Sequence, residues 1–383
     1  MRIAVVAPSV YMSEKTYPER IFAPRIVVLQ LVEGLVNKGH DVTLFSAPDI
    51  KTKAKLVGGP ANLLMGNLLR DKYLNREILM EYRLQSATES RDFYTLDLIG
   101  KALWEDKKQK FDIIQTDDPL FHPFVELSNA TVCFIFHDPL PRRESLDFWF
   151  LNNYKKHNFI SISMAQRIGE PALNFVGNTY HGLNEKVYLP SFEEGKYVAY
   201  FGRLLVQKGP DLAIRAAMEA GESIKIASDK THFNTEFVKK NVLPFVNGDK
   251  VEHVGLMVTS EEKSAFLGNA KATLFPIQWD EPFGLVVTES MACGTPVIVY
   301  NRGSIQELVK DGVTGFIIDP DNEDRPGKGA WTIKKQGIEG LVEGIKRIGE
   351  IDRRVCRKHV EENFTIEKMV DGYENIYQKL LSQ

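Results

Sequence analysis

The stretch Ala272–Leu308, ATLFPIQWDEPFGLVVTESMACGTPVIVYNRGSIQEL, predicts the fold and carries much of the chemistry of this chain. Ala272–Ile277 is a short apolar run of strand type, and Leu285–Ala292 has the length of a helix. Gly294 stands where a glycine commonly ends a helix, and Pro296–Val299 follows as a second buried strand. This order of strand, loop, helix and strand predicts a parallel α/β sheet with its loops at the carboxyl edge.

Two glutamates lie around the start of the expected helix. Glu281 comes just before it, and Glu289 follows about one turn after its start. Between them we expect free backbone N–H groups at Gly284, Leu285 and Val286, where the positive helix end favours an anion such as a diphosphate. Carboxylates accept hydrogen bonds from the vicinal hydroxyls of a ribose or a sugar. Two acids beside an anion site therefore predict a nucleotide sugar as the ligand.

These residues also carry a resemblance to a known family. Glu281–Gly284 with Glu289 resembles the Glu-x7-Glu signature of retaining glycosyltransferases of family 4, also named glycosyltransferase group 1, which have the GT-B fold. Three further runs are similar to that family, namely Met291–Ile298, Arg302–Ser304 and Asp311–Phe316. The resemblance implies an α/β chain with two Rossmann-like domains whose parallel sheets face each other across an interdomain cleft.

The domain organisation follows from length and resemblance together. A chain of 383 residues with 43% hydrophobic content exceeds what a single core usually supports. We expect an acceptor-side domain at 1–190 and a nucleotide-sugar-binding domain at 191–365. The resemblance implies that a last helix, at 366–383, crosses back to the first domain.

Composition excludes several classes of protein. The formal net charge of -3 argues against a general nucleic-acid binder. The apolar run at the start is too short for a signal peptide, and no stretch is long enough to span a bilayer. Cys133, Cys293 and Cys356 form no Cys-x-x-Cys pair, which predicts buried, reduced thiols. We expect a cytoplasmic protein, and we leave open a peripheral contact with the inner face of the membrane through helices at 61–100.

Two cations follow the strand Tyr197–Phe201. Arg203 and Lys208 lie in one loop, which begins at Gly202, so both can reach the same diphosphate. An arginine and a lysine in a loop are more often ordinary surface charges. Here they match the family's Arg-x4-Lys pair, and the resemblance gives them the role of holding the donor diphosphate.

The resemblance also implies how the donor is held. Glu281 would bind hydroxyls of the donor sugar, and Glu289 would bind the ribose. The loop from Gly255 to Met257 would line the base. The complete set of further donor-binding residues that we expect is Phe283, Gly284, Leu285, Val286, Gly202, Gly255 and Met257.

His137 follows the expected strand Thr131–Phe136, at the edge of the sheet where sites of α/β proteins lie. A single histidine is more often structural than functional. Its position resembles that of the family's N-domain histidine, so we expect His137 to orient the donor sugar. The role of Asp138 stays open.

The acceptor side departs from the family. Ile3–Val6, Pro24–Lys38 and Val42–Phe45 predict a strand, a helix and a second strand. Where related enzymes have a glycine-rich loop before the helix, this chain has Phe22-Ala23-Pro24-Arg25. Proline suits a first helical turn, but these residues lack the conformational freedom of glycine. We therefore expect a remodelled acceptor site.

The expected chemistry needs no metal and no organic cofactor. The Asp-x-Asp element Asp319–Asp321 is interpreted as a turn, because it opens a hydrophilic loop. The negative charge of the leaving diphosphate would then be stabilised by Arg203, Lys208 and the helix end. The resemblance implies retention of configuration, with the leaving phosphate itself taking the acceptor proton, so we assign no general base.

Competing functions are a non-catalytic nucleotide-sugar-binding partner of another transferase and a GT-B nucleotide-sugar epimerase. The altered loop Phe22–Arg25 favours the first of these, whereas the presence of all four charged site residues argues against it. A dehydrogenase is disfavoured, because no Gly-x-Gly-x-x-Gly follows either first strand. The sequence does not predict the donor base, the sugar, or whether the acceptor is a glycan, a lipid-linked molecule or a small molecule.

Overall fold

The computed structural model describes residues 1–17, 22–64, 87–170, 172–320 and 329–383. The chain forms two compact units, each with its own sheet. Unit 1 comprises Met1–Ile162, Gly169–Thr179 and Met369–Gln383, and unit 2 comprises Ser163–Ile168 and Tyr180–Lys368. The expectation of two α/β domains is confirmed, while the domain limits at 190 and 366 stay predictions.

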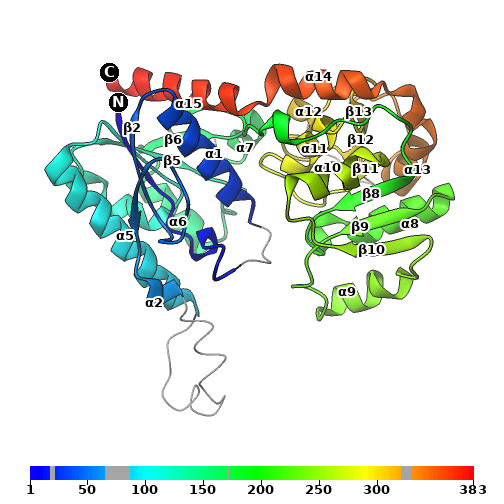
Figure 1. Ribbon diagram of the computed structural model, residues 1–383, viewed down its shortest axis with the longest axis horizontal. Helices are drawn as coiled ribbons and strands as arrows, with labels where there is room; N and C mark the ends of the chain where they lie inside the picture. The colour runs from blue at the N-terminus through cyan, green and yellow to red at the C-terminus, as the bar shows by residue number, and fades with distance from the viewer. Residues whose placement is uncertain (18–21, 65–86, 171, 321–328) are drawn as a thin grey trace, which may run out of the picture. The chain divides into compact units, whose positions relative to one another are not determined.

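Unit 1 is built on a parallel sheet with the strand order β3-β2-β1-β4-β5-β6-β7 (Figure 1). Its first strand lies in the middle, with Ile3 paired to Val42 on one side and to Ile113 on the other. The chain reverses its direction across the sheet between β1 and β4, the position at which open α/β sheets place their ligands. The strands are β1 (Arg2–Val6), β2 (Asp41–Ser46), β3 (Lys55–Gly58), β4 (Ile113–Thr116), β5 (Thr131–Ile135), β6 (Asn158–Ser161) and β7 (Phe175–Asn178).

Helices cover this sheet because its strands are apolar on both faces. Helix α5 packs on β1 and β2, and α1 packs on β2. Helix α15 is tied to the end of α1 by Lys38, whose ammonium donates to Glu374. Its expected packing residues Tyr373 and Tyr377 are fully buried. The helices named here are α1 (Ala23–Asn37), α2 (Ala61–Leu64), α5 (Ala87–Gln109), α6 (Leu146–Asn153) and α15 (Ile366–Leu381).

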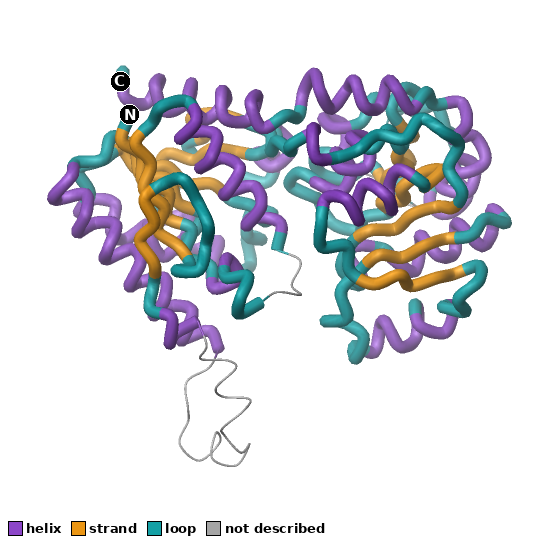
Figure 2. The backbone as a smooth tube through the Cα atoms, in the orientation of Figure 1, coloured by secondary structure: helices purple, strands orange, loops and turns teal. Residues whose placement is uncertain are grey.

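Unit 2 has a second parallel sheet with the order β10-β9-β8-β11-β12-β13. The reversal here lies between β8 and β11, so the loops after these two strands flank the expected ligand position. Figure 2 shows the strands of this sheet in orange. They are β8 (Tyr197–Phe201), β9 (Ile224–Ala227), β10 (Val251–Gly255), β11 (Ala270–Phe275), β12 (Val297–Tyr300) and β13 (Gly315–Ile318).

The helices of unit 2 form two packed groups. One group joins α8 to α13, and the other joins α11 to α10 and α14. Right-handed crossovers place α8 and α11 on opposite faces of the sheet, and α13, which follows the last strand, returns to the face of α8. The helices are α7 (Met164–Ile168), α8 (Pro210–Ala220), α9 (Glu236–Asn241), α10 (Ser260–Gly268), α11 (Leu285–Ala292), α12 (Ile305–Leu308), α13 (Gly337–Arg347) and α14 (Arg353–Asn363).

Most expected elements are present within a residue or two of their predicted limits, and α11 has the limits predicted for it. Strands β3, β6 and β7 were missed, because each is only four residues long and contains polar residues or glycine. Of the helices expected at 61–100, α2 and the start of α5 are present, whereas 65–86 lie outside the described residues.

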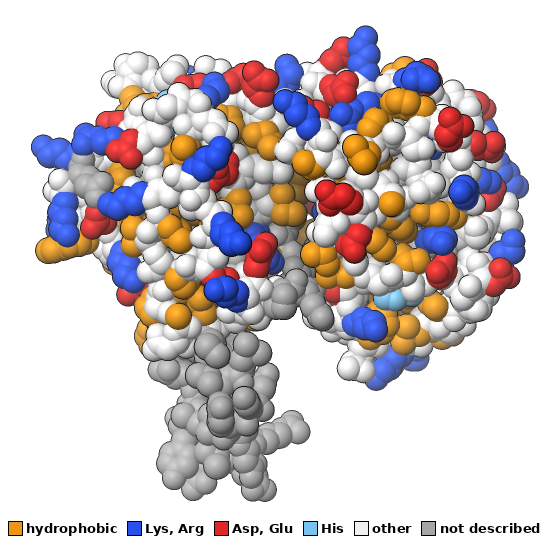
Figure 3. Space-filling model, viewed as in Figure 1, with side chains coloured by type: hydrophobic (Ala, Val, Ile, Leu, Met, Phe, Trp, Pro, Cys, Tyr) orange, Lys and Arg blue, Asp and Glu red, His pale blue; other side chains and the backbone are white. Residues whose placement is uncertain are grey.

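The three cysteines are buried and unpaired, which confirms the expectation of core thiols. Burial raises the pKa of Cys293 and of Cys356 to about 12, so both remain thiols at neutral pH. Side chains of both charges are interspersed over the face seen in Figure 3. Among the described residues, no helix has the length and apolar character needed to cross a membrane.

Candidate functional site

Two loops meet at the carboxyl edge of the sheet in unit 2. The loop after β8 ends at Gly209, whose φ is 66°, and a Cβ there would lie 2.2 Å from the carbonyl oxygen of Pro276. Only glycine permits this close approach. The contact is continued by the amide of Gln278, which donates to the carbonyl oxygen of Gln207 at 2.8 Å. The loops after β8 and β11 therefore form one surface at the reversal point of the sheet.

Glu281 and Lys208 come together on this surface. The Lys208 ammonium donates to Oε2 of Glu281 at 2.6 Å, and the indole N–H of Trp279 donates to the same oxygen at 2.7 Å. The ammonium also lies 4.8 Å from the centroid of the Trp279 ring. Both charged side chains are about 14% exposed or less, so water screens their attraction only in part. A diphosphate bound by Lys208 would share its ammonium with Glu281.

The tripeptide Arg302–Ser304 holds the loop that carries Glu281. Gly303 has a φ of 58°, and a Cβ there would lie 2.2 Å from the carbonyl oxygen of Glu281. The amide of Ser304 donates to that same oxygen at 3.0 Å, and its hydroxyl donates to the carbonyl oxygen of Phe283. A motif recognised in the sequence thus acts through backbone contacts that position Glu281 and Phe283.

Arg203 is placed by the backbone of its loop. The buried hydroxyl of Tyr200 donates to the carbonyl oxygen of Arg203 at 3.0 Å and lies 3.5 Å from that of Lys208. Burial raises the pKa of Tyr200 far above its ordinary value, so the hydroxyl stays protonated and donates. Within the described parts of the chain, no carboxylate forms an ion pair with the Arg203 guanidinium. Its charge is therefore available to an anion.

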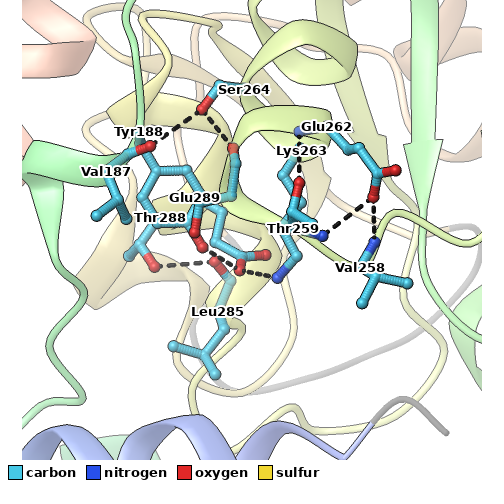
Figure 4. A network of polar contacts seen from close by, with 11 residues as sticks. Val187, Tyr188, Val258, Thr259, Glu262, Lys263, Ser264, Leu285, Thr288 and Glu289 are labelled. Carbon is cyan, nitrogen blue, oxygen red and sulfur yellow. Dashed lines mark hydrogen bonds and ion pairs between the residues drawn. The ribbon is translucent and has the colours of Figure 1, made fainter. Parts of the chain in front are cut away.

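Glu289 lies on α11, whose first residue follows the cap Gly284. The N–H groups of the first turn, at Leu285 and Val286, have no partner within a helix. Oε1 of Glu289 accepts hydrogen bonds from the ammonium of Lys263 at 2.7 Å and from the hydroxyl of Tyr188 at 2.6 Å (Figure 4). Burial and the nearby carboxylate raise the pKa of Tyr188 well above its ordinary value. The second expected acid is thus held by residues that the sequence analysis did not select.

Gly255 is the last residue of β10, an edge strand of the same sheet, and Met257 lies in the loop that follows. The carbonyl oxygen of Gly255 accepts from the amide of Ser228 at 3.0 Å. Next along the chain, the amides of Val258 and Thr259 donate to Glu262 at 2.8 and 3.0 Å. This capping box begins α10 and fixes the end of the loop. The role of Gly255 and Met257 toward a base stays a prediction.

His137 belongs to unit 1, where it lies beside an acid at the ends of two neighbouring strands. Nε2 of His137 is 3.8 Å from Oδ2 of Asp117, which directly follows β4. Oδ1 of Asp117 is buried and has no hydrogen-bond partner among the described residues. Burial, aided by the charges of Asp118 and Asp138, raises the pKa of Asp117 to about 7. Burial lowers the pKa of His137 to about 4.

Between those two pKa values the His137 and Asp117 side chains are both neutral. Asp117 was not predicted as a site residue, although its place immediately after a buried strand was an available signal. The expected contact of His137 with a donor sugar stays a prediction.

The Asp-x-Asp element is only partly described, because Asp321 lies outside the described residues. Asp319 accepts hydrogen bonds from Asn301 at 2.9 Å and from the indole of Trp331 at 3.0 Å. In the described ranges, no cluster of three His, Cys, Asp or Glu residues could hold a metal ion. Metal independence stays a prediction.

Three residues that the sequence analysis left out are Trp279, Lys263 and Tyr188. Trp279 was quoted in the loop before α11, but its indole had no assigned partner. Lys263 offered a signal, since it shares the buried side of α10 with Phe266 and Leu267. A lysine in a buried stripe usually has an ionic partner. Nothing local to Tyr188 pointed to Glu289.

Comparisons with known proteins place this site in context. Residues 184–336 match the family model described as glycosyl transferases group 1. An uncharacterized glycosyltransferase of Methanocaldococcus jannaschii is 27% identical over 207 residues, which cover 52% of this chain and 53% of that protein. The match thus spans about half the length of that curated relative.

Solved structures resemble the whole chain. Sucrose-phosphate synthase from Thermosynechococcus elongatus has a TM-score of 0.74 at 18% identity, and HepE from Anabaena in complex with UDP-glucose has a TM-score of 0.65 at 16% identity. Each match covers 100% of both chains. These likenesses concern the fold, and they show that the chain has the GT-B fold that the Glu-x7-Glu resemblance implied.

Proposed function

We propose that this chain, whose residues 184–336 belong to the family of glycosyl transferases group 1, transfers a sugar from a nucleoside-diphosphate donor to a hydroxyl of an acceptor. The observation that carries the proposal is the junction of Lys208, Glu281 and Trp279 at the reversal point of the sheet in unit 2. This junction places a cation that can bind phosphate beside a carboxylate that can bind sugar hydroxyls. The carboxylate belongs to the loop directly before α11. The complex of HepE with UDP-glucose supports the same class of donor.

The site residues fit the departure of a diphosphate. A sugar that leaves a diphosphate passes through a state resembling an oxocarbenium ion, and negative charge grows on the leaving group. Arg203, Lys208 and the first N–H groups of α11 would stabilise that charge, with no metal ion. Glu281 would bind hydroxyls of the donor sugar, and Glu289 those of the ribose.

We further propose retention of anomeric configuration. This rests on the Glu-x7-Glu resemblance, and we assign no separate general base. In this mechanism the leaving phosphate takes the proton of the acceptor hydroxyl, and His137 orients the donor sugar.

The first experiment is a binding screen of the intact chain against UDP-, GDP- and ADP-sugars with EDTA present. Thermal shift identifies the nucleotide, and calorimetry gives its affinity. A selective response without metal would support the donor site and name the base. If the folded protein binds none of the three classes of nucleotide sugar, the proposal is contradicted.

A non-catalytic nucleotide-sugar-binding partner is the second candidate. It is favoured by the start of α1, where Ala23 and Pro24 replace the glycines of related enzymes. Arg25 there is 8% exposed and lies 3.5 Å from Glu14, so the turn is filled by side chains. Binding of a donor without hydrolysis or transfer to any glycan, lipid-linked or small-molecule acceptor would favour this candidate.

A further inference from the structure

The two carboxylates of the site are held in the same way. In Glu281, one oxygen accepts from the ammonium of Lys208 and from an aromatic N–H, that of Trp279. In Glu289, one oxygen accepts from the ammonium of Lys263 and from an aromatic O–H, that of Tyr188 (Figure 4). Each carboxylate therefore has one oxygen bound by the protein and a second oxygen with which it can accept a ligand hydroxyl.

The pair on Glu289 is assembled as one unit. Ser264, the neighbour of Lys263 on α10, accepts from the amide of Leu189 at 3.1 Å. Its hydroxyl donates to the carbonyl oxygen of Ser260 at 2.6 Å and lies 3.4 Å from that of Val187. Ser264 thus ties the residue after Tyr188 to α10 and lies beside the residue before it, as Figure 4 shows in part. The carbonyl oxygen of Tyr188 also accepts from Arg357 at 2.8 Å. Lys263 and Tyr188 therefore approach Glu289 from a fixed framework.

The charge of Lys263 has a specific consequence. Lys263 is 9% exposed and Glu289 is 6% exposed, so their attraction is weakly screened by water. Glu289 lies one turn into α11, close to the N-terminal groups that would bind a diphosphate. Without the ammonium, its buried negative charge would oppose that anion. With the ammonium in place, the carboxylate can accept a hydrogen bond from a hydroxyl beside the diphosphate, with little repulsion between the two negative charges.

From these contacts we infer that Lys263 and Tyr188 are positioning residues, which turn Oε2 of Glu289 toward the ribose diol and make the site selective for ribonucleotide over 2′-deoxyribonucleotide donors. The inference rests on the proposed function and goes beyond it, because it assigns a sugar-ring preference within the nucleotide. Donors built on thymidine diphosphate, which lacks the 2′-hydroxyl, would then bind more weakly than donors built on a ribonucleotide.

The test compares nucleoside diphosphates that differ in that one hydroxyl. Calorimetry at low temperature measures UDP against 2′-deoxy-UDP, and likewise the GDP and ADP pairs. The natural chain should prefer the ribo form of its nucleotide at least about tenfold, since a hydrogen bond to a charged group is lost in the deoxy form. Tyr188→Phe and Lys263→Met should reduce this ratio to below about threefold.

This ratio of ribo to deoxy affinities distinguishes a positioning role from general structural damage, because a loss of structure weakens the binding of both nucleotides equally. Tyr197→Phe is the matched control, since its buried hydroxyl donates to the carbonyl oxygen of Phe266 at 2.7 Å and does not contact Glu289. It should leave the ratio unchanged. If Lys263→Met fails to fold, the inference is tested by Tyr188→Phe alone, which removes a single hydroxyl.

Two outcomes would overturn the inference, and they are distinct. A natural chain that binds ribo and deoxy forms equally, or variants that keep its full preference, would contradict the role of Lys263 and Tyr188 and leave the proposed function standing. A natural chain that binds no nucleotide of any base would contradict the proposed function itself.

Discussion

The carboxyl edges of the two sheets place their acids in opposite surroundings. In unit 2, Glu281 and Glu289 each accept a hydrogen bond from a lysine ammonium. In unit 1, Asp117 lies beside the buried His137, and its neighbours Asp118 and Asp138 are acids. A lysine offsets the charge of a buried carboxylate, whereas burial without a cation, together with two neighbouring acids, favours the protonated form of Asp117. The edge of unit 2 is therefore suited to an anionic ligand, whereas Asp117 is kept uncharged below about pH 7.

The largest effect is expected when the ion pair between Lys263 and Glu289 in unit 2 is broken. Lys263→Met leaves Glu289 buried without its cation, which should cost about 3–5 kcal/mol of stability. Differential scanning calorimetry should show the melting transition of unit 2 lowered by roughly 10 °C. Lys271→Met is the matched control, because the ion pair of Lys271 with Glu222 is 27% and 30% exposed and should contribute about 0–1 kcal/mol. Equal shifts in both variants would contradict the special position of Lys263.

The next effect concerns catalysis at Lys208. Lys208→Ala removes both a cation for the diphosphate and the partner of Glu281, so turnover should fall by about a hundredfold to a thousandfold. Arg203→Ala should act in the same direction by at least about a hundredfold. Initial rates with the donor found in the binding screen provide the measurement. Lys225→Ala, which breaks an exposed ion pair with Glu252, is the control and should retain the natural rate. Near-normal rates in Lys208→Ala and Arg203→Ala as well would mean that the diphosphate site is misplaced.

The third effect tests the contrast in unit 1 through pH. The pKa of Asp117 is raised from 3.8 to about 7, so the folded chain keeps a proton that the unfolded chain releases. Stability from this group is then present below about pH 4 and is lost as the pH rises to about 7. Asp117→Asn should therefore be more stable than the natural chain at pH 8 by about 2–4 kcal/mol, with the difference disappearing near pH 4. The upper figure corresponds to roughly three pKa units at about 1.4 kcal/mol each, and the lower one allows for the 18% exposure of the Asp117 side chain to water.

Thermal melts of unit 1 from pH 4 to 8 measure this difference. His137, whose pKa is lowered, changes stability in the opposite direction in both chains, so the comparison isolates Asp117. The exposed Glu144, changed to Gln, should show no such pH-dependent gain. A parallel pH dependence in Asp117→Asn and the natural chain would refute the assignment.

The smallest expected effect concerns Trp279. Trp279→Phe keeps an aromatic ring beneath Lys208 and removes the N–H that holds Glu281. Loss of one hydrogen bond to a charged group should lower kcat/KM by about tenfold. Trp331→Phe, which removes an indole hydrogen bond to Asp319 instead, should leave kcat/KM unchanged. A larger loss with Trp331→Phe than with Trp279→Phe would place the donor site elsewhere.

Much of the fold could be predicted because its signals are local. The strand before Arg203 and the helix after Gly284 were predicted from runs of apolar residues and from glycine positions. Strands such as β7 were missed, since a four-residue strand with glycine and asparagine has little periodicity to detect. The predicted site residues of unit 2 lie at the carboxyl edge or on α11, as the α/β pattern required.

The sequence by itself determined two parallel α/β sheets, the helix that starts after Gly284 and the match of residues 184–336 to the family model of glycosyl transferases group 1. Only the tertiary structure decided that Tyr188, Lys263 and Glu289 converge, although 101 positions separate the first from the last. It also decided that Asp117 and His137 lie together. Local patterns report backbone geometry, whereas the partner of a buried charge depends on which elements the fold packs against each other.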